Sequence, residues 1–317
     1  MHLSQTLLGI SFSNPTVLTA GPWGWTAADL FAVAESGAGA VTTKSMRANE
    51  HAGNHEPTVV TTPFYSLNAV GLPYGGAEMA KKEVGAYMAK HPVPFIANIV
   101  GMTAQDFVEI ARVVVPLKPD VLEVNLSSPT FLKLRGSFLT ENTQEFQEII
   151  TSVKKEAGDI PVFVKLSPNV PNIGEIAKAC VDAGADGLTA INTIGPGMAI
   201  DVETRMPILS AWKGGMSGRG AKSIAVRCIA DIYAATEGKI PLIGVGGMTT
   251  GADAVEMLLA GASLVGIGTA IWERGTEVFR LVCEELSAWC DAHGVKNVSE
   301  LTGGLHREIA LQGKQYK

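Results

Sequence analysis

Residues 242–269 read LIGVGGMTTGADAVEMLLAGASLVGIGT, and this stretch indicates the fold. An apolar run, Leu242–Val245, is followed by a helical pattern, Gly251–Ala260, and then by a second apolar run, Leu264–Gly268. Both runs are apolar on their two faces, as expected of buried parallel strands. A short strand, a helix and another short strand in this order form a unit whose two strands pair in parallel. The stretch therefore predicts an α/β fold.

The same alternation extends over most of the chain. The other predicted strands are Thr16–Ala20, Ala40–Thr43, Pro94–Ile99, Val121–Asn125, Val162–Leu166 and Gly187–Ile191. The other predicted helices are Ala27–Ser36, Ala77–Lys90, Ala104–Pro116, Glu141–Glu156, Ile173–Ala183, Ala221–Ala235 and Glu273–Ala292. Eight strand–helix units are the number that closes a (β/α)8 TIM barrel. We predict one barrel domain over residues 1–317, with an N-terminal hairpin at Leu7–Phe12 and insertions at Arg47–Asn68 and Gly195–Gly220.

Composition and charge exclude several classes of protein. A hydrophobic content of 46% is ample for a buried core, so disorder is excluded. The net charge of −6 argues against a nucleic-acid partner, which would favour a basic surface. No run is long and apolar enough for a signal peptide or a membrane span, so a cytoplasmic protein without a membrane partner is predicted.

Cysteine usage argues against a metal centre or a disulfide framework. The four cysteines are Cys180, Cys228, Cys283 and Cys290. No C-x-x-C pair occurs among them, so we predict neither a zinc site nor an iron–sulfur site. The low density of cysteines is typical of a reducing compartment.

Glycines follow the last two predicted strands. Gly246 and Gly247 end the seventh strand, and Gly268 and Thr269 end the eighth. Loops after these two strands commonly bind phosphate in TIM barrels, because glycine lets backbone N–H groups approach an anion at a helix N-terminus. The pair of loops predicts a phosphate-bearing ligand.

Polar side chains, mostly lysines and amides, occupy the ends of other strands, where TIM-barrel active sites lie. These residues are Lys44, Ser45, Asn98, Asn125, Lys165 and Asn192. A lysine there is costly to bury unless a charge compensates it. Lys165 could pair with a core carboxylate, stabilise the negative charge of a reduced flavin, or form a Schiff base in a lyase or isomerase. A Ser–His hydrolase is disfavoured, because no G-x-S-x-G motif occurs and no histidine lies at a strand end.

These motifs together resemble the dihydroorotate dehydrogenases, flavin enzymes of pyrimidine (UMP) biosynthesis. The resemblance covers about Leu7–Trp272. The matching phrases include Asn14–Gly21, Thr43–Ser45, Gly53–Asn54, Asn68–Pro73, Asn125–Pro129, Val164–Pro168, Ile191–Thr193, Asp201–Arg205, Gly215–Gly218, Gly244–Gly247 and Ala260–Thr269. The segments Asn192–Arg205 and Gly215–Gly218 are most similar to class 1, in particular the class 1B catalytic subunit.

The resemblance implies a set of site residues. FMN contacts would come from Gly21, Lys44, Ser45, Asn98, Asn125, Lys165, Ile191, Gly218, Gly246, Gly247, Gly268 and Thr269. Dihydroorotate contacts would come from Lys44, Asn68, Gly71, Leu72, Asn125, Asn192 and Thr193. The implied catalytic residues are Ser128, as the general base that removes the C5 proton while hydride leaves C6 for flavin N5, and Lys165, which would stabilise the reduced flavin.

The resemblance also implies a homodimer and, for class 1B, an electron-transfer subunit carrying an iron–sulfur cluster and FAD. The electron acceptor stays open between that partner, NAD reached through it, and a soluble acceptor such as fumarate.

Two positions depart from the class 1 pattern: Ser128 stands where most members have cysteine, and Thr130 replaces an asparagine. Phe131–Asn142 also differs from the usual glycine-rich loop. A different cyclic amide or enone therefore remains an alternative substrate.

Overall fold

Eight parallel strands close into a barrel in the computed structural model, which describes residues 2–127 and 143–316. In order around the barrel they are β3 (Thr16–Leu18), β4 (Ala40–Thr42), β9 (Phe95–Ile99), β10 (Val121–Asn125), β11 (Val162–Leu166), β12 (Gly187–Ala190), β17 (Leu242–Val245) and β18 (Leu264–Ile267). Pairing of β18 with β3, where Val265 lies opposite Thr16, closes the ring. The predicted TIM barrel and its eight strands are confirmed.

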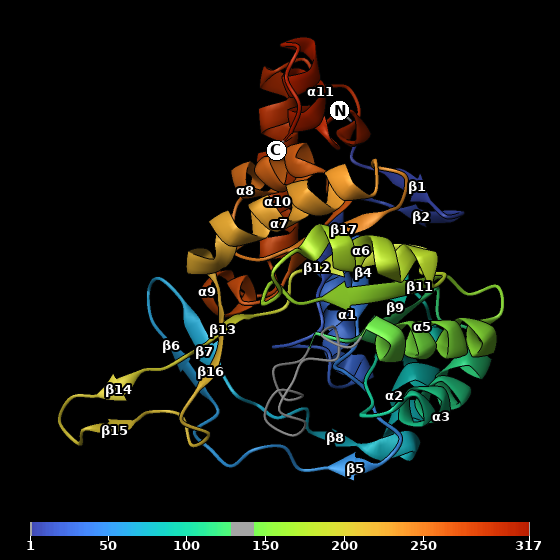
Figure 1. The fold of residues 1–317 in the computed structure, drawn as a ribbon, viewed down its shortest axis with the longest axis vertical. Coiled ribbons are helices and arrows are strands. Elements are labelled where there is room, and N and C mark those ends of the chain that lie inside the picture. The colour runs from blue at the N-terminus through green and yellow to red at the C-terminus, as the bar shows by residue number, and fades with distance from the viewer. Residues whose placement is uncertain (1, 128–142, 317) are drawn as a thin grey trace.

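Helices surround the barrel (Figure 1). They are α1 (Ala27–Glu35), α2 (Gly76–Met88), α3 (Ala104–Val114), α5 (Thr143–Ala157), α6 (Ile173–Asp182), α7 (Lys222–Ala235), α8 (Gly251–Ala260), α9 (Ala270–Arg274), α10 (Val278–Ala292) and α11 (Gly304–Leu311). Capping boxes of one threonine and one aspartate begin α1, α3 and α8, and satisfy backbone N–H groups that a helix leaves unpaired. No helix within residues 2–127 or 143–316 has both the length and the apolar character needed to cross a bilayer.

The prediction of a single helix over Glu273–Ala292 is wrong. Gly275 adopts a φ of 64° and donates its N–H to the carbonyl of Ile271, which ends α9. A left-handed residue of this kind cannot continue a helix, and α10 begins three residues later. The two helices share one apolar pattern in the sequence, which concealed the break.

The predicted N-terminal hairpin is confirmed as β1 (Gln5–Leu7) and β2 (Ile10–Phe12). Leu8 and Gly9 form its turn with positive φ angles of 51° and 79°. Phe12 belongs to the apolar cluster that fills the inside of the barrel, and Leu7 and Ile10 pack against that cluster. The hairpin therefore closes the end of the barrel opposite the C-terminal ends of the strands.

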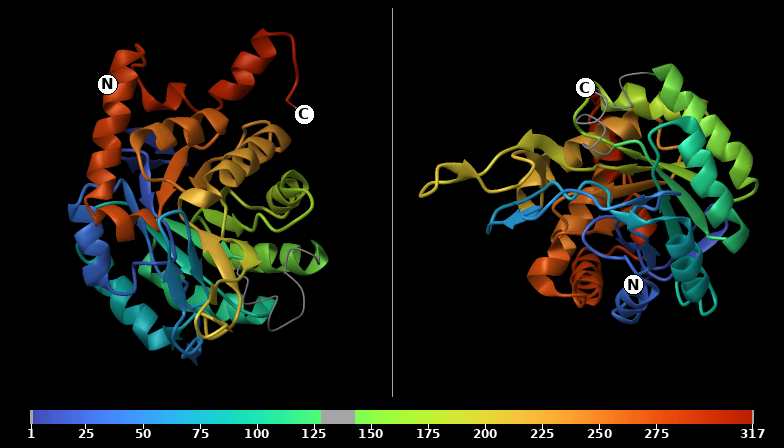
Figure 2. Two further views of the ribbon diagram at one scale, coloured as in Figure 1. Left: turned by 90° about the vertical axis from the view of Figure 1, so that its left-hand side faces the viewer. Right: turned by 90° about the horizontal axis from the view of Figure 1, so that it is seen from below.

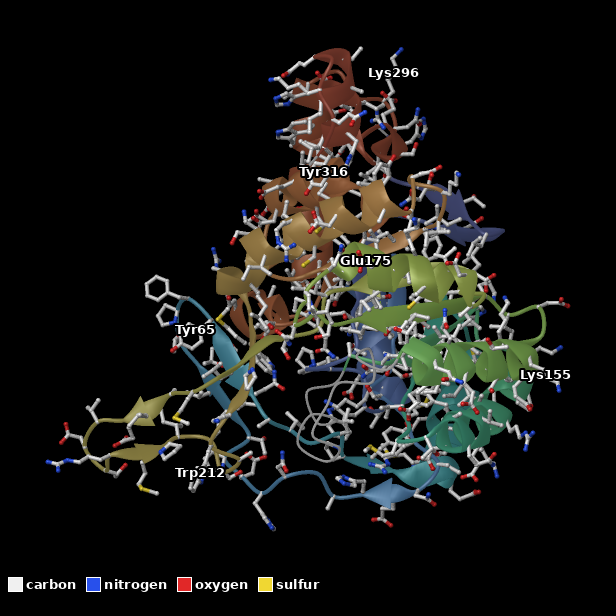
Figure 3. All side chains as sticks on the ribbon, viewed as in Figure 1. Tyr65, Lys155, Glu175, Trp212, Lys296 and Tyr316 are labelled. Atoms are coloured by element: carbon white, nitrogen blue, oxygen red, sulfur yellow. The ribbon has the colours of Figure 1, made fainter. Side chains whose placement is uncertain are left out.

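The two predicted insertions pair with each other, which we did not predict. Their strands form an antiparallel sheet in the order β13 (Ile194–Gly197), β16 (Gly214–Ser217), β7 (Ser66–Asn68) and β6 (Val59–Thr61). Two further pairs of short strands, β5 (Glu50–His51) with β8 (Tyr74–Gly75) and β14 (Ile200–Asp201) with β15 (Met206–Pro207), form separate two-stranded sheets. The sheet and the β14–β15 hairpin project from the barrel (Figures 1 and 2), and Figure 3 places Tyr65 and Trp212 on this part, far from Lys155 of α5.

Candidate active site

Two adjoining cavities of about 350 and 390 Å³ lie between the C-terminal ends of the strands and the antiparallel sheet. Each has the size of a small-molecule site. Residues that line both cavities include Gly21, Lys44, Asn68, Lys165, Asn192 and Thr193. The barrel supplies the lysines and the sheet supplies Asn68, so the site depends on the pairing of the two insertions.

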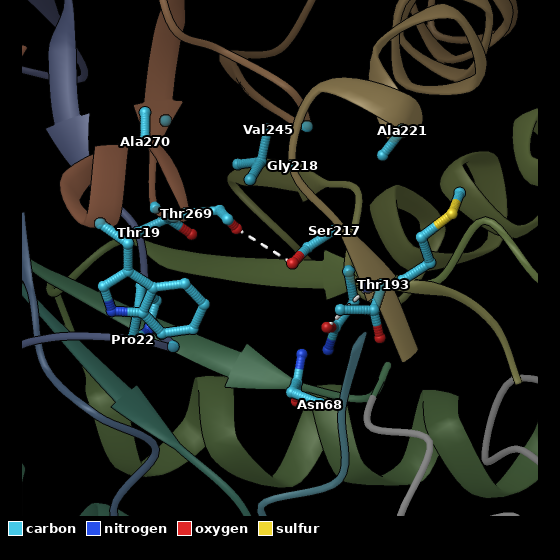
Figure 4. A pocket seen from close by; sticks show the side chains of 18 of the residues that line it. Thr19, Pro22, Asn68, Thr193, Ser217, Gly218, Ala221, Val245, Thr269 and Ala270 are labelled. Carbon is cyan, nitrogen blue, oxygen red and sulfur yellow. Dashed lines mark hydrogen bonds between the residues drawn. The ribbon is translucent and has the colours of Figure 1, made fainter. Parts of the chain in front are cut away.

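The first cavity contains the predicted phosphate loops (Figure 4). Gly246 and Gly247 adopt φ angles of 137° and 73°, and a Cβ on Gly247 would come within 2.7 Å of Lys222 Cβ. The hydroxyl groups of Thr269 and Ser217 lie 3.0 Å apart (Figure 4). The predicted cofactor residues on this wall are Ile191, Gly218, Gly246, Gly247, Gly268 and Thr269. Glycine at these positions leaves backbone N–H groups accessible, and Thr269 adds a hydroxyl group. This end of the cavity is therefore suited to a phosphate.

The second cavity contains most of the predicted substrate residues. Its lining includes Ser45, Gly71, Leu72 and Asn125, together with the residues shared by both cavities. Asn125 donates from Nδ2 to Ser45 Oγ at 3.1 Å, and its Oδ1 accepts from Ser127 Oγ at 3.0 Å. Asn192 in turn donates to Ser127 Oγ at 3.0 Å. The two asparagines are thereby held in fixed orientations by serines, as recognition of a polar ring requires.

Two buried lysines converge on these cavities. Lys44 is 7% exposed, donates from Nζ to the Gly21 carbonyl at 2.8 Å, and lies 4.8 Å from the centre of the Trp25 ring. Lys165 is 3% exposed and donates to Thr19 Oγ1 and to the Ala20 carbonyl, both at 3.2 Å. Among the described residues, neither forms an ion pair.

Burial changes the acidity of both lysines. Loss of hydration lowers the pKa of Lys44 to about 8, and the positive charge of Lys165 lowers it further in the same direction. Burial also lowers the pKa of Lys165, and the Glu123 carboxylate opposes this change. Two buried cations without direct counterions favour an anionic ligand in the cavities.

Nearly all predicted site residues are thus brought together; Asn98 and Ser128 are the exceptions. Asn98 is fully buried on β9 and is absent from the lining of both cavities. Ser128 and Thr130 lie outside the described residues. From the sequence we did not identify Trp25, which lies on a loop, or Ser217, which lies on the inserted strand β16. We also did not identify Glu123, although a single acidic residue in the apolar strand β10 is a detectable signal.

A sequence model of the family described as "Dihydroorotate dehydrogenase" matches residues 2–289. The chain belongs to the dihydroorotate dehydrogenase family. It is 40% identical over 304 residues to the "Dihydroorotate dehydrogenase B (NAD(+)), catalytic subunit" of Methanothermobacter thermautotrophicus, covering 96% of this chain and 98% of that protein. The protein of the same description from Anoxybacillus flavithermus is 39% identical over 304 residues, with 95% of each chain covered.

Solved dihydroorotate dehydrogenase structures share the fold. Ligand-free DHODH from Eimeria tenella superposes with a TM-score of 0.85 at 26% identity, covering 96% of this chain and 92% of that one. The same enzyme in complex with ferulenol gives a TM-score of 0.82 at 25% identity, covering 96% and 89%. The family resemblance inferred from the motifs is confirmed, including its class 1B character, and the chain is an oxidoreductase. The lyase interpretation of Lys165 is therefore set aside.

Proposed function

We propose that this protein oxidises dihydroorotate to orotate in de novo pyrimidine biosynthesis, with FMN as its bound cofactor. The observation that carries the proposal is the pair of buried lysines, Lys44 and Lys165, at the junction of the two cavities. One cavity offers glycine loops suited to a phosphate, and the other offers oriented amides suited to a small polar ring. The named relatives support the same reaction.

The residues present fit FMN. Asn98 Oδ1 is buried without a hydrogen-bond partner among the described residues, and it is the kind of acceptor that a flavin imide N–H would satisfy. The phosphate would lie against the first cavity's glycines and Thr269. The proposed FMN contacts are Gly21, Lys44, Ser45, Asn98, Asn125, Lys165, Ile191, Gly218, Gly246, Gly247, Gly268 and Thr269. When bound, FMN supplies the acceptor for the hydride that leaves substrate C6.

The substrate would occupy the second cavity. Dihydroorotate has a carboxylate and a ring with amide N–H and C=O groups, so it requires a cation and several amides. Lys44 would bind the carboxylate, and Asn125 and Asn192 would bind the ring. The remaining proposed contacts are Asn68, Gly71, Leu72 and Thr193. A different cyclic amide or enone would need the same donors. Dihydroorotate is therefore proposed as the substrate because the chain belongs to the dihydroorotate dehydrogenase family.

Ser128 is the proposed general base for the C5 proton. It lies outside the described residues, but Ser127 before it is fully buried and hydrogen-bonded to Asn125 and Asn192. The chain therefore enters this segment beside the two asparagines proposed to hold the substrate ring. General bases act within hydrogen-bond reach of the proton they remove.

The partners are proposed from the family. The relatives are named as catalytic subunits of an NAD(+) enzyme, which supports a second subunit that takes electrons onward. We propose that this subunit carries FAD and an iron–sulfur cluster, that the catalytic chain forms a homodimer, and that the assembly works in the cytoplasm.

Analysis of the purified protein's chromophore tests the cofactor proposal. We expect one FMN per chain, released on denaturation and identified by its mass. A colourless protein that borohydride links covalently to a carbonyl compound at Lys165 would contradict the proposal, because only a Schiff-base mechanism gives that product.

Substrate binding is expected to weaken at alkaline pH. Lys44 has a pKa of about 8, so above that pH the free site must take up a proton before an ammonium can bind the carboxylate. The dissociation constant of orotate, followed by its effect on flavin absorbance, should rise by up to roughly tenfold per pH unit above this pKa. Lys44→Met should bind orotate weakly and lose this pH dependence. A wild-type constant that stays flat from neutral pH into the alkaline range would contradict the role of Lys44.

A further inference from the structure

Glu123 is a buried acid that the proposed mechanism does not use. It lies on β10, is 1% exposed, and belongs to the inward face of the strand with Val121 and Asn125. Burying a carboxylate is costly unless hydrogen bonds or a nearby cation compensate it. The side chain therefore needs a structural or functional explanation.

Both oxygens of Glu123 accept a hydrogen bond. Oε1 accepts from Asn98 Nδ2 at 2.5 Å, and Oε2 accepts from Thr189 Oγ1 at 2.5 Å. Because a carboxylate only accepts, it holds the Asn98 NH₂ group and leaves Oδ1 as the atom without a partner. Glu123 thus determines which end of the Asn98 amide is left to accept a further hydrogen bond.

Glu123 also lies beneath Lys165. Asn125 is opposite Lys165 in the barrel register, and Glu123 precedes it by two residues, one inward-facing position deeper. Thr189, which donates to Glu123, is opposite Lys165 on the other neighbouring strand. Lys165 donates its hydrogen bonds to Thr19 and Ala20 rather than to Glu123, so the carboxylate acts on Lys165 through its charge.

We propose that Glu123 is the positioning residue of the flavin site: its carboxylate orients the Asn98 amide toward the cofactor and supplies the counter-charge for Lys165. This inference rests on FMN being the bound cofactor. Neither Glu123 nor Asn98 lines a cavity, whereas Lys165 lines both. Glu123 acts through Asn98 and Lys165.

The proposal predicts a pH dependence with a definite direction. Burial lowers the pKa of Lys165, whereas the Glu123 carboxylate raises it; the charge of Lys165 in turn lowers the pKa of Lys44. The other charged side chains lining the cavities are exposed: Glu56 and Lys213 lie on loops, and Glu273 lies on α9. Removing Glu123 should therefore lower the pKa of Lys165 further, so that the ammonium is lost at a lower pH.

Release of FMN from the holoenzyme at different pH values measures the effect of Glu123 on cofactor binding, and it does not depend on catalysis. Dilution frees part of the flavin, and its fluorescence gives a dissociation constant at each pH. For Glu123→Gln we expect FMN to bind roughly 10- to 100-fold more weakly, the size of a lost hydrogen bond to a charged group, and to lose affinity at a lower pH than in wild type. Glu175→Gln on the outer surface of α6 (Figure 3) is the matched control and should resemble wild type.

Glu123→Asp separates the orientation of Asn98 from the counter-charge for Lys165. It also provides a second test if Glu123→Gln folds poorly. Aspartate retains the charge but cannot reach Asn98, so weaker FMN binding with wild-type pH dependence is expected. FMN release identical to wild type in both Glu123 variants would overturn the proposal. A wild-type protein that binds no FMN would instead overturn the proposed cofactor, which distinguishes the two failures.

Discussion

Ser128→Ala is expected to slow the reduction of bound flavin by dihydroorotate by about 10²–10⁴-fold, the usual contribution of a general base. FMN should remain bound, because the proposed FMN contacts do not include Ser128. Anaerobic stopped-flow absorbance measures the rate. Ser128→Cys is the matched variant and should retain activity with a pH–rate profile shifted to lower pH, because a thiolate forms more readily than an alkoxide. Reduction of Ser128→Ala at the wild-type rate would mean that another group removes the C5 proton.

Lys165→Ala is expected to have the second large effect. The variant loses a buried cation at the junction of the cavities, where negative charge develops as the flavin is reduced. We expect flavin reduction to slow by about 10²–10³-fold, the effect of removing one preorganised electrostatic contact, together with weaker FMN retention. Flavin content per chain and the stopped-flow rate are the two measurements.

Substitution of a surface lysine is the control for the loss of one positive charge from the protein. Lys155 is exposed on α5 (Figure 3), and Lys155→Ala should leave both measurements unchanged. Normal flavin content and a normal reduction rate in Lys165→Ala would exclude its proposed role. A defect shared by both variants would point to a general effect of charge.

The barrel was predictable because its signals are local. Each strand, such as Leu242–Val245, is a short run that is apolar on both faces, and each is followed by a helical pattern. The strand ends then defined the site: Lys44, Lys165 and the glycines after β17 and β18 meet because parallel strands place their C-terminal ends at one face.

Features that depend on distant pairing were not predictable. The sheet that carries Asn68 forms only when β7 pairs with β16, and four of the eight barrel strands lie between these two strands in the chain. Gly215 opposes Asn68 there, but neither short segment has a pattern that identifies its partner. The break at Gly275 was missed for a different reason, since apolar residues continue on both sides of it. Glu123 was overlooked because its partners, Asn98 and Thr189, lie on two other strands.

Anaerobic titration of the purified protein with dihydroorotate tests the proposed reaction most directly. Lys44, Lys165 and the oriented asparagines are proposed to bring the substrate ring and FMN together in the adjoining cavities. We expect the flavin absorbance to bleach in proportion to added dihydroorotate, with one orotate formed per flavin reduced. A flavin that stays oxidised in excess dihydroorotate, yet is reduced by another cyclic amide or enone, would contradict it.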